Sequence, residues 1–372
     1  MKKLAVIFIL SATLALVIAP APTSVSATKN TIIPKYIQVT TNPQYDRDPS
    51  LFKADDGTYW LFFARGRDLR QVRDFNGYNP DLDYYDIYFK TAGSVLGLET
   101  AVETQIPLTP PDNAQRDISA LQTNDGIIRV FTSTGLGEGT QRFIYHYSYD
   151  GSWHGPTAVP GTDYAAHISV LEDRSKIWIF FDIGYVLYVV SYDETTFQWS
   201  SPVHIADNAT IAKAIVDGGT FYVVWSFVNG VDIWGSGIYL STSSDGTTWD
   251  TTLNPIAAWP AVGSTNWDPV LTKDNDLFRL IWAPDAGAEG QFLATTTSAT
   301  PTDTGSWSTP VKLTTTSFET NTWWDFWPQP FTDGIQYLFY TSERNAAATG
   351  RIDANIWLRL NFYEIYLPLV QR

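Results

Sequence analysis

The chain has 372 residues, enough for one large domain or two ordinary ones. Its 39 acidic and 24 basic residues give a formal net charge of −15 at pH 7, which argues against nucleic acid and anionic membranes as partners. The chain contains no cysteine, so 15 Trp, 20 Tyr and 20 Phe residues have to supply a core that no disulfide supports.

Residues 1–27 are expected to form a secretory signal peptide. Lys2 and Lys3 precede an apolar run from Leu4 to about Pro20, and the small residues 25–27 offer a cleavage site. The run is short for a membrane span, and no later segment reaches its length. We therefore expect a secreted, extracellular protein without a membrane span. Its mature charge, without the two lysines, is −17 (22 basic against 39 acidic residues).

Residues 28–362 are expected to form a single domain built from a repeat. In six stretches a polar residue opens a short apolar strand, and a tight turn, an aromatic strand, a loop and an alternating strand follow. Asp-Gly pairs, a strong hairpin signal, begin at residues 56, 125, 217 and 333. The aromatic strands begin, in chain order, at Trp60, Ile128, Trp178, Tyr222, Arg279 and Tyr337.

Six repeats of about four strands predict an all-β fold, a six-bladed β-propeller. The sixth repeat lacks an outer strand after residues 355–360, and residues 36–40 resemble the outer strands at 202–206 and 311–315. We expect this N-terminal strand to complete the sixth blade and close the ring. A five-bladed propeller with one misassigned hairpin, or a pair of β-sandwiches, is the alternative. Residues 363–372 form an apolar C-terminal tail with no assigned role.

The strand directions place the residues that open each first strand around the mouth of the central channel. Three of these strands open with Asp48, Asp117 and Asp268, and Asp325 adds a fourth carboxylate. Convergent carboxylates in an aromatic-lined mouth are typical of glycosidases, in which one acid protonates the leaving oxygen and another is ionised. Asp48 is the candidate base or nucleophile, and Asp117, Asp268, Asp325 or Glu319 is the candidate acid. Each aspartate has an alternative role, bracing neighbouring loops through backbone hydrogen bonds.

Cationic and aromatic side chains near the same openings are candidates for substrate binding. Indole rings stack on the C–H faces of sugars, although they can equally form the core between blades. Similarly, a histidine facing the channel can assist catalysis or serve only as a hydrogen-bonded structural residue. The candidates are Arg47, Arg67, Arg116, His167, Trp267, Trp324 and Trp327.

No cofactor or metal is expected, with Ca²⁺ as the alternative left open. The loop from Arg65 to Asp83 carries Asp74, Asn76 and Asp81, oxygen ligands that Ca²⁺ accepts, but their spacing matches no EF-hand. With four histidines and no cysteine, zinc has little support.

Two short motifs carry a resemblance to a known superfamily. The segment SSDGTTW from Ser243 resembles the Asp-box of the sialidase superfamily, one residue short, and SYDGSW from Ser148 is a weaker echo. In that superfamily the box lies in the turn between third and fourth strands. Arg47-Asp48-Pro49 resembles the sialidase Arg-Ile-Pro motif, whose arginine binds the substrate carboxylate. Only Arg47 and Arg116 match the three arginines that a sialidase converges on that carboxylate.

The same tripeptide is also similar to the Arg-Asp-Pro motif of five-bladed furanosidases such as arabinanases and fructan hydrolases. That resemblance implies that Asp48 acts as base or transition-state stabiliser. The sequence therefore favours a secreted, monomeric glycoside hydrolase, sialidase-like or arabinanase-like, with a carbohydrate substrate. A non-catalytic sugar-binding propeller and a polysaccharide lyase using His167 and a tyrosine are the alternatives.

Overall fold

The computed structural model describes residues 36–67, 85–108, 114–135, 143–228, 237–261, 263–286, 290–314, 324–344 and 354–360. The proposed signal peptide, Glu319, most of the loop between Arg65 and Asp83, and the C-terminal tail lie outside these residues.

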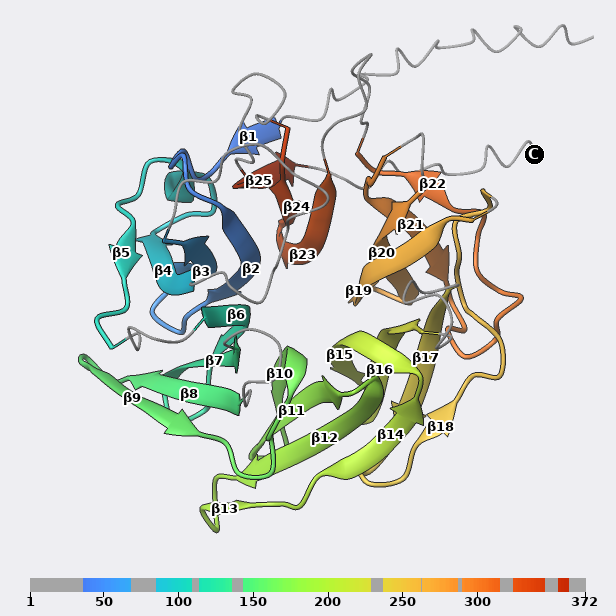
Figure 1. Ribbon diagram of the computed structural model, residues 1–372, viewed down its shortest axis with the longest axis horizontal. Helices are drawn as coiled ribbons and strands as arrows, with labels where there is room; N and C mark the ends of the chain where they lie inside the picture. Colours follow the sequence, from blue (N-terminus) through green and yellow to red (C-terminus); the bar gives the residue numbers. More distant parts are fainter. Residues whose placement is uncertain are drawn as a thin grey trace, which may run out of the picture. The chain divides into compact units, whose positions relative to one another are not determined.

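Six antiparallel sheets are arranged in a ring, as the repeat predicts (Figure 1). The all-β, six-bladed propeller is thereby confirmed, and the five-bladed and sandwich alternatives are wrong. Within the described ranges the only helical segment is the short 3-10 helix Leu96–Glu99 between β4 and β5.

The first three blades follow one another along the chain. Blade one contains β2 (Asp46–Lys53), β3 (Tyr59–Gly66), β4 (Tyr85–Ala92) and β5 (Thr104–Gln105). Blade two contains β6 (Ala114–Gln122), β7 (Ile128–Gly135), β8 (Phe143–Tyr149) and β9 (Trp153–Ala158). Blade three contains β10 (Ala166–Asp173), β11 (Lys176–Ile183), β12 (Val186–Asp193), β13 (Gln198–Trp199) and β14 (Val203–Asp207).

The last three blades repeat the plan. Blade four contains β15 (Ala209–Asp217), β16 (Thr220–Phe227), β17 (Ile238–Ser243) and β18 (Asp250–Thr251). Blade five contains β19 (Thr265–Asp274), β20 (Leu277–Asp285), β21 (Ala294–Ser298) and β22 (Val311–Lys312). Blade six contains β23 (Asp325–Asp333), β24 (Ile335–Ser342), β25 (Asn355–Leu360) and β1 (Tyr36–Gln38).

Blade six is completed by the N-terminal strand, as expected from the sequence. Strand β1 pairs antiparallel with β25, with Ile37 opposite Leu358, so strands from the two ends of the domain lie side by side (Figure 1). Just beyond β1, the backbone N–H of Val39 donates to the Ile356 carbonyl at 2.8 Å. The ring is therefore closed by backbone hydrogen bonds, which a chain without cysteine requires.

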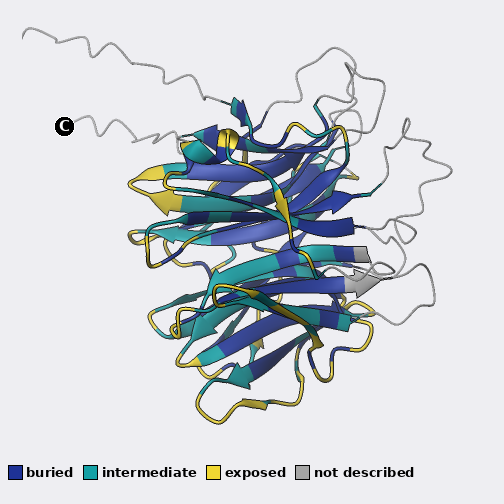
Figure 2. Ribbon diagram, turned by 90° about the vertical axis from the view of Figure 1, so that its left-hand side faces the viewer, coloured by how far each residue is buried: buried dark blue, intermediate teal, exposed yellow. Residues whose placement is uncertain are grey.

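The aromatic second strands form the core between blades. Phe62 and Phe63 on β3, and Phe180 and Phe181 on β11, are fully buried, so both faces of these strands pack against neighbours. Figure 2 shows buried residues along the middle of the strands and exposed residues at the turns. Burial of each phenylalanine side chain stabilises the fold by about 1.5–3 kcal/mol.

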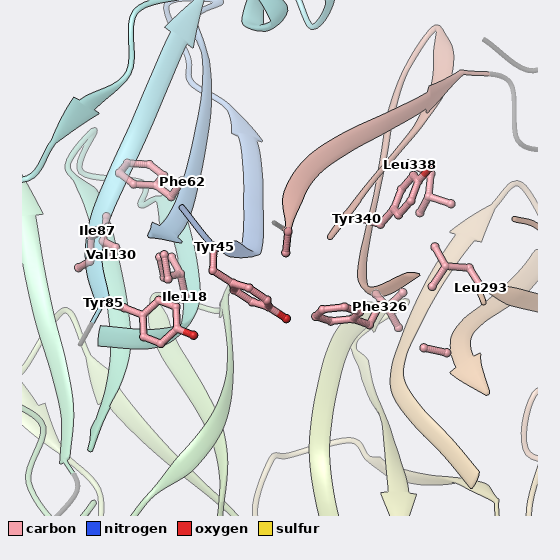
Figure 3. Packing of buried hydrophobic residues seen from close by; sticks show 14 of the residues in the cluster. Tyr45, Phe62, Tyr85, Ile87, Ile118, Val130, Leu293, Phe326, Leu338 and Tyr340 are labelled. Atoms are coloured by element: carbon pink, nitrogen blue, oxygen red, sulfur yellow. The ribbon is translucent and has the colours of Figure 1, made fainter. Parts of the chain in front are cut away.

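One core cluster joins the two ends of the ring. In Figure 3, Tyr45, which precedes β2, and Phe326 on β23 extend toward each other between blades one and six. The Tyr45 hydroxyl donates to Glu343 Oε1 at 3.3 Å, which adds a polar contact across the same junction.

Turn chemistry accounts for the hairpins. Gly57 and Gly126, in the turns between first and second strands of blades one and two, have φ of 86° and 80°, which glycine adopts without strain. At the Asp-box, Asp245 Oδ1 accepts the backbone N–H groups of Thr247 and Thr248 at 2.7 and 2.8 Å. This turn joins β17 to β18, the third and fourth strands, where the resemblance placed it.

Candidate functional site

A β-bulge recurs at the same point in the first strand of every blade. The pairing register with the second strand shifts there by an extra residue in all six blades. At each shift one non-glycine residue has φ between 48° and 55°, a conformation that side chains with a Cβ rarely adopt. We call these six the ring residues: Asp48, Asp117, His167, Ile211, Asp268 and Trp327.

The ring residues line a single pocket to which all six first strands contribute. The rest of the lining comes from residues that follow them in the strands, among them Pro49, Lys213 and Gln329. The space left open is about 30 Å³, room for one or two water molecules and too little for a sugar ring. The bulges therefore gather Asp48, Asp117 and Asp268, residues of three different blades, around a water-sized space.

Asp48 is almost completely buried beside a cation. Its Oδ2 accepts Arg47 Nε at 2.9 Å and the backbone N–H of Asp117 at 2.8 Å. Its Oδ1 is buried and has no hydrogen-bond partner in the described part of the chain. Burial raises the pKa of Asp48 above its ordinary value; the Arg47 charge opposes this rise and the charge of Asp117 adds to it. A carboxylate in this state is a stronger base than an exposed one.

Asp117 is held as an anion. Its Oδ2 accepts Ser133 Oγ at 2.5 Å and the backbone N–H of His167 at 3.1 Å, and Arg47 Nη2 lies 3.8 Å from its Oδ1. Although burial disfavours the charge, His167, Arg47 and the hydrogen bond from Ser133 hold the pKa of Asp117 well below its ordinary value.

The pKa of Asp268 is shifted in the direction opposite to that of Asp117. Its Oδ2 accepts the backbone N–H of Trp327 at 3.2 Å, and its other oxygen makes no hydrogen bond within the described residues. Burial raises the pKa of Asp268 to about 6, against the Trp327 hydrogen bond, and the charge of Asp48 adds to the rise. Asp268 and Asp117 thus titrate far apart while lining the same pocket.

His167 carries a positive charge that neighbouring carboxylates stabilise. Its Nδ1 lies 2.9 Å from Asp182 Oδ1, which comes from the end of the second strand β11. Burial lowers the pKa of His167, but the charge and hydrogen bond of Asp182, with smaller contributions from Asp117 and Asp268, raise it to about 9. At neutral pH the imidazole is therefore positively charged.

Lys213 is, with His167, the second cation that lines the pocket. Its Nζ donates to the Ile168 carbonyl at 3.0 Å, which ties blade four to blade three. Burial lowers the pKa of Lys213, while the charges of Asp117, Asp48 and Asp268 oppose that change.

The pocket carboxylates also brace the ring. Asp48, Asp117 and Asp268 each accept a backbone N–H from the ring residue of the following blade, and Asp182 Oδ1 accepts that of Ile211 at 3.3 Å. A second tier of clamps uses serine hydroxyls: Ser50, Ser119 and Ser169 accept the N–H groups of Ala120, Val170 and Ala214. The sequence left two roles open for these aspartates, lining the channel mouth together or bracing neighbouring loops. In the structure they do both.

Arg47 spans the junction of blades one and six. Its guanidinium carbon lies 3.6 Å from the centroid of the Trp327 ring, a cation–π contact, and its side chain is only 7% exposed. Arg47 therefore joins blades one and six at the level of the ring residues, where Trp327 has no carboxylate to accept a backbone N–H from the next blade.

Asp325, expected at the channel mouth, lies two residues before Trp327 and does not line the pocket. Its buried carboxylate accepts Arg344 Nη2 at 3.3 Å. The corresponding position in blade one is Asp46, which sequence reasoning missed and whose carboxylate binds Arg65 through two hydrogen bonds of 2.6 and 2.8 Å. In blades one and six an aspartate stands two residues before the ring residue, and this spacing is the signal that identifies the pair.

The remaining candidates also lie outside the pocket lining. Arg67 forms an ion pair with Asp86 at 2.6 Å, and Trp267 Nε1 donates to Thr265 Oγ1 at 2.9 Å. Trp267 and Trp324 pack against the core cluster that contains Tyr45. Arg116 lies with its guanidinium carbon 5.9 Å from the Tyr85 ring.

In the described segments, no group of three or more His, Cys, Asp or Glu side chains is arranged to hold a metal ion. The same segments contain no helix with the length and apolar character needed to cross a membrane.

The fold is shared with several solved structures. A protein of unknown function from Dyadobacter fermentans matches with a TM-score of 0.65 at 14% identity, over 88% of this chain and 97% of that one. The sialidase of Trypanosoma rangeli matches with a TM-score of 0.58 at 9% identity, over 88% of this chain and 59% of that one. An α-L-arabinofuranosidase from Lactobacillus brevis matches with a TM-score of 0.50 at 14% identity, over 85% and 90% of the two chains.

No protein-family model and no curated protein matches the sequence. The architecture is a six-bladed β-propeller, and the similarity to the Trypanosoma rangeli sialidase and the Lactobacillus brevis arabinofuranosidase is one of fold.

Proposed function

We propose that the protein is a secreted glycoside hydrolase whose reaction takes place at the mouth of the ring pocket. One observation carries the proposal: Asp268 and Asp117 line the same pocket while burial raises the pKa of Asp268 to about 6 and neighbouring cations lower that of Asp117. Acid–base cleavage of a glycosidic bond needs one protonated and one ionised carboxyl group at the same pH.

In this proposal Asp268 is the general acid. Below about pH 6 its carboxyl group is protonated, and the oxygen that makes no hydrogen bond within the described chain carries the proton to the leaving glycosidic oxygen. Asp117 stays ionised and stabilises the positive charge that develops at the anomeric carbon.

Asp48 is the proposed base. Burial raises its pKa, which strengthens it as a proton acceptor, and the adjoining space admits water but not a sugar ring. The sugar then binds above the pocket, with the attacking water beside Asp48.

The test is hydrolysis of a panel of polysaccharides, with analysis of the released products, by the wild type and Asp268→Asn. The variant should lose at least about 100-fold in kcat, since removal of a general acid typically costs that much. The matched control is Asp207→Asn, an aspartate with a 72% exposed side chain on β14, which should keep full activity. Full activity in Asp268→Asn would contradict the assigned role.

A non-catalytic sugar-binding propeller is the second candidate, favoured by the backbone hydrogen bonds that Asp48, Asp117 and Asp268 make to the following blade. It predicts binding to glycans in the same panel without product release.

Secretion is part of the proposal and rests on the N-terminal segment. N-terminal sequencing of protein exported by an expressing cell should find residue 28 at the start of the mature chain. Recovery of the full chain from the cytoplasm alone would contradict it.

A further inference from the structure

Two cations at the pocket, Arg47 and His167, are already paired with carboxylates of the chain, whereas Lys213 donates to a backbone carbonyl. Arg47 donates from Nε to Asp48 at 2.9 Å and directs Nη2 toward Asp117 at 3.8 Å. His167 contacts Asp182 at 2.9 Å. A carboxylate on a substrate would have to compete with these internal anions for the same N–H groups.

The face of Arg47 is also covered. The Trp327 ring lies 3.6 Å from its guanidinium carbon, and the Arg47 side chain is 7% exposed. Recognition of a carboxylate by arginine uses two parallel N–H groups at an open edge of the guanidinium. Here Asp48 and Asp117 lie along the edges and Trp327 lies over the face. The Arg47 guanidinium therefore makes contacts within the ring of blades, and neither its edges nor its face is open to a ligand.

The pocket lining carries a net negative charge when its carboxyl groups are ionised, which for Asp268 means above about pH 6. The carboxylates of Asp48, Asp117 and Asp268 then face two cations, His167 and Lys213. Burial further favours the neutral form of Lys213. Like charges placed together in a partly buried site are strongly disfavoured, so such a site discriminates against anions.

We propose that the mouth of the ring pocket takes an uncharged sugar and rejects sugars that carry a carboxylate. Arg47 is the specificity-determining residue, because its guanidinium is already engaged by Asp48, Asp117 and Trp327. This inference rests on the proposed function in one respect, that the ligand is a glycan. It separates this protein from the sialidases whose fold it shares.

The test measures binding of the wild type to neutral arabinan and galactan and to anionic polygalacturonate and polysialic acid, by affinity electrophoresis at one ionic strength. At least one neutral glycan should bind about tenfold or more tightly than either anionic one, given the cost of an unpaired like charge. Tighter binding of an anionic glycan, or no binding to any of the four, would overturn the inference.

Failure of the inference and failure of the proposed function give different results. Hydrolysis of polygalacturonate or polysialic acid in preference to the neutral glycans would overturn the inference but support the proposed glycosidase activity. Preferential binding of a neutral glycan without hydrolysis would support the inference and contradict the proposed glycosidase activity.

Asp117→Asn tests the part assigned to Arg47. Loss of one neighbouring anion should raise the affinity for polygalacturonate relative to the bound neutral glycan by about tenfold, and the control Asp207→Asn should leave that ratio unchanged. An unchanged ratio in a folded Asp117→Asn would contradict the proposal.

Binding of the wild type at several salt concentrations tests the same proposal without any variant. The preference for the neutral glycan should narrow between about 50 mM and 500 mM NaCl, because salt screens the repulsion. A preference independent of salt would contradict an electrostatic origin.

Discussion

Replacement of His167 by glutamine is predicted to remove a pH-dependent part of the stability of the fold. In the folded protein His167 Nδ1 lies 2.9 Å from Asp182, and Asp117 and Asp268 also act on its charge. Burial lowers the pKa of His167, but these carboxylates raise it from 6.5 to about 9. A group whose pKa is higher in the folded state stabilises that state while it is protonated.

The magnitude follows from the difference between the two pKa values. A shift from 6.5 to about 9 corresponds, at 1.36 kcal/mol per pKa unit, to about 3 kcal/mol. The His167 side chain is 34% exposed, so screening by solvent reduces this contribution to about 2 kcal/mol. The contribution is complete below pH 6.5 and is lost as the pH rises through about 9.

The assay is urea unfolding of the wild type and His167→Gln at about pH 6 and pH 9.5. The free energy of unfolding of the wild type should fall by about 2 kcal/mol more than that of the variant between these pH values. His204→Gln is the control for the loss of an imidazole, since His204 pairs with Asp207 at an exposed site. Parallel pH dependence in the wild type and His167→Gln would refute the reasoning.

Three further variants test the packing that positions the pocket. Asp46→Asn should lower the free energy of unfolding by about 3 kcal/mol, because it leaves the buried Arg65 without its bidentate partner; a loss below about 1 kcal/mol in urea unfolding would contradict this. Ser119→Ala removes one clamp between blades and should cost about 1 kcal/mol, whereas an unchanged unfolding midpoint would show that the clamp is idle. Gly246→Ala should cost about 2 kcal/mol or more, measured as a lower Tm, since a Cβ there would meet Trp178 at 2.4 Å and φ is 75°; an equal or higher Tm would rule out this account of the Asp-box turn.

The sequence predicts the fold well because its determinants are local. Each blade carries its own strand pattern and several carry an Asp-Gly hairpin, so errors in one repeat do not affect the others. Closure of the ring by residues 36–38 was also predictable, because blade six visibly lacks an outer strand.

The arrangement of the site was predictable only in part. Asp48, Asp117 and Asp268 were identified because each opens a strand, but the bulge that turns them toward the channel depends on backbone φ rather than residue type. Ile211 occupies the same position without any polar signal. A displacement of two residues along β23 was enough to confuse Asp325 with the ring position of Trp327, because strand positions i and i+2 share a face.

Side-chain contacts between distant repeats could not be predicted from the sequence. Arg47 and Trp327 lie at opposite ends of the chain, and only the closed ring brings the guanidinium onto the indole. The resemblance to a substrate-binding arginine motif therefore could not reveal that Arg47 is bound by Asp48 and Trp327.

Titration of the aspartate side chains, followed by NMR of ¹³C-labelled carboxyl groups, tests most directly whether distant blades create one electrostatically coupled pocket. We predict that two aspartate signals titrate near pH 6, those of Asp46 and Asp268. The signal that disappears in Asp268→Asn should move to lower pH in Asp48→Asn, because Asp48 raises the pKa of Asp268. If the Asp268 signal titrates near pH 4 and does not respond to Asp48→Asn, the two carboxyl groups do not share a pocket and the proposed acid–base chemistry is contradicted.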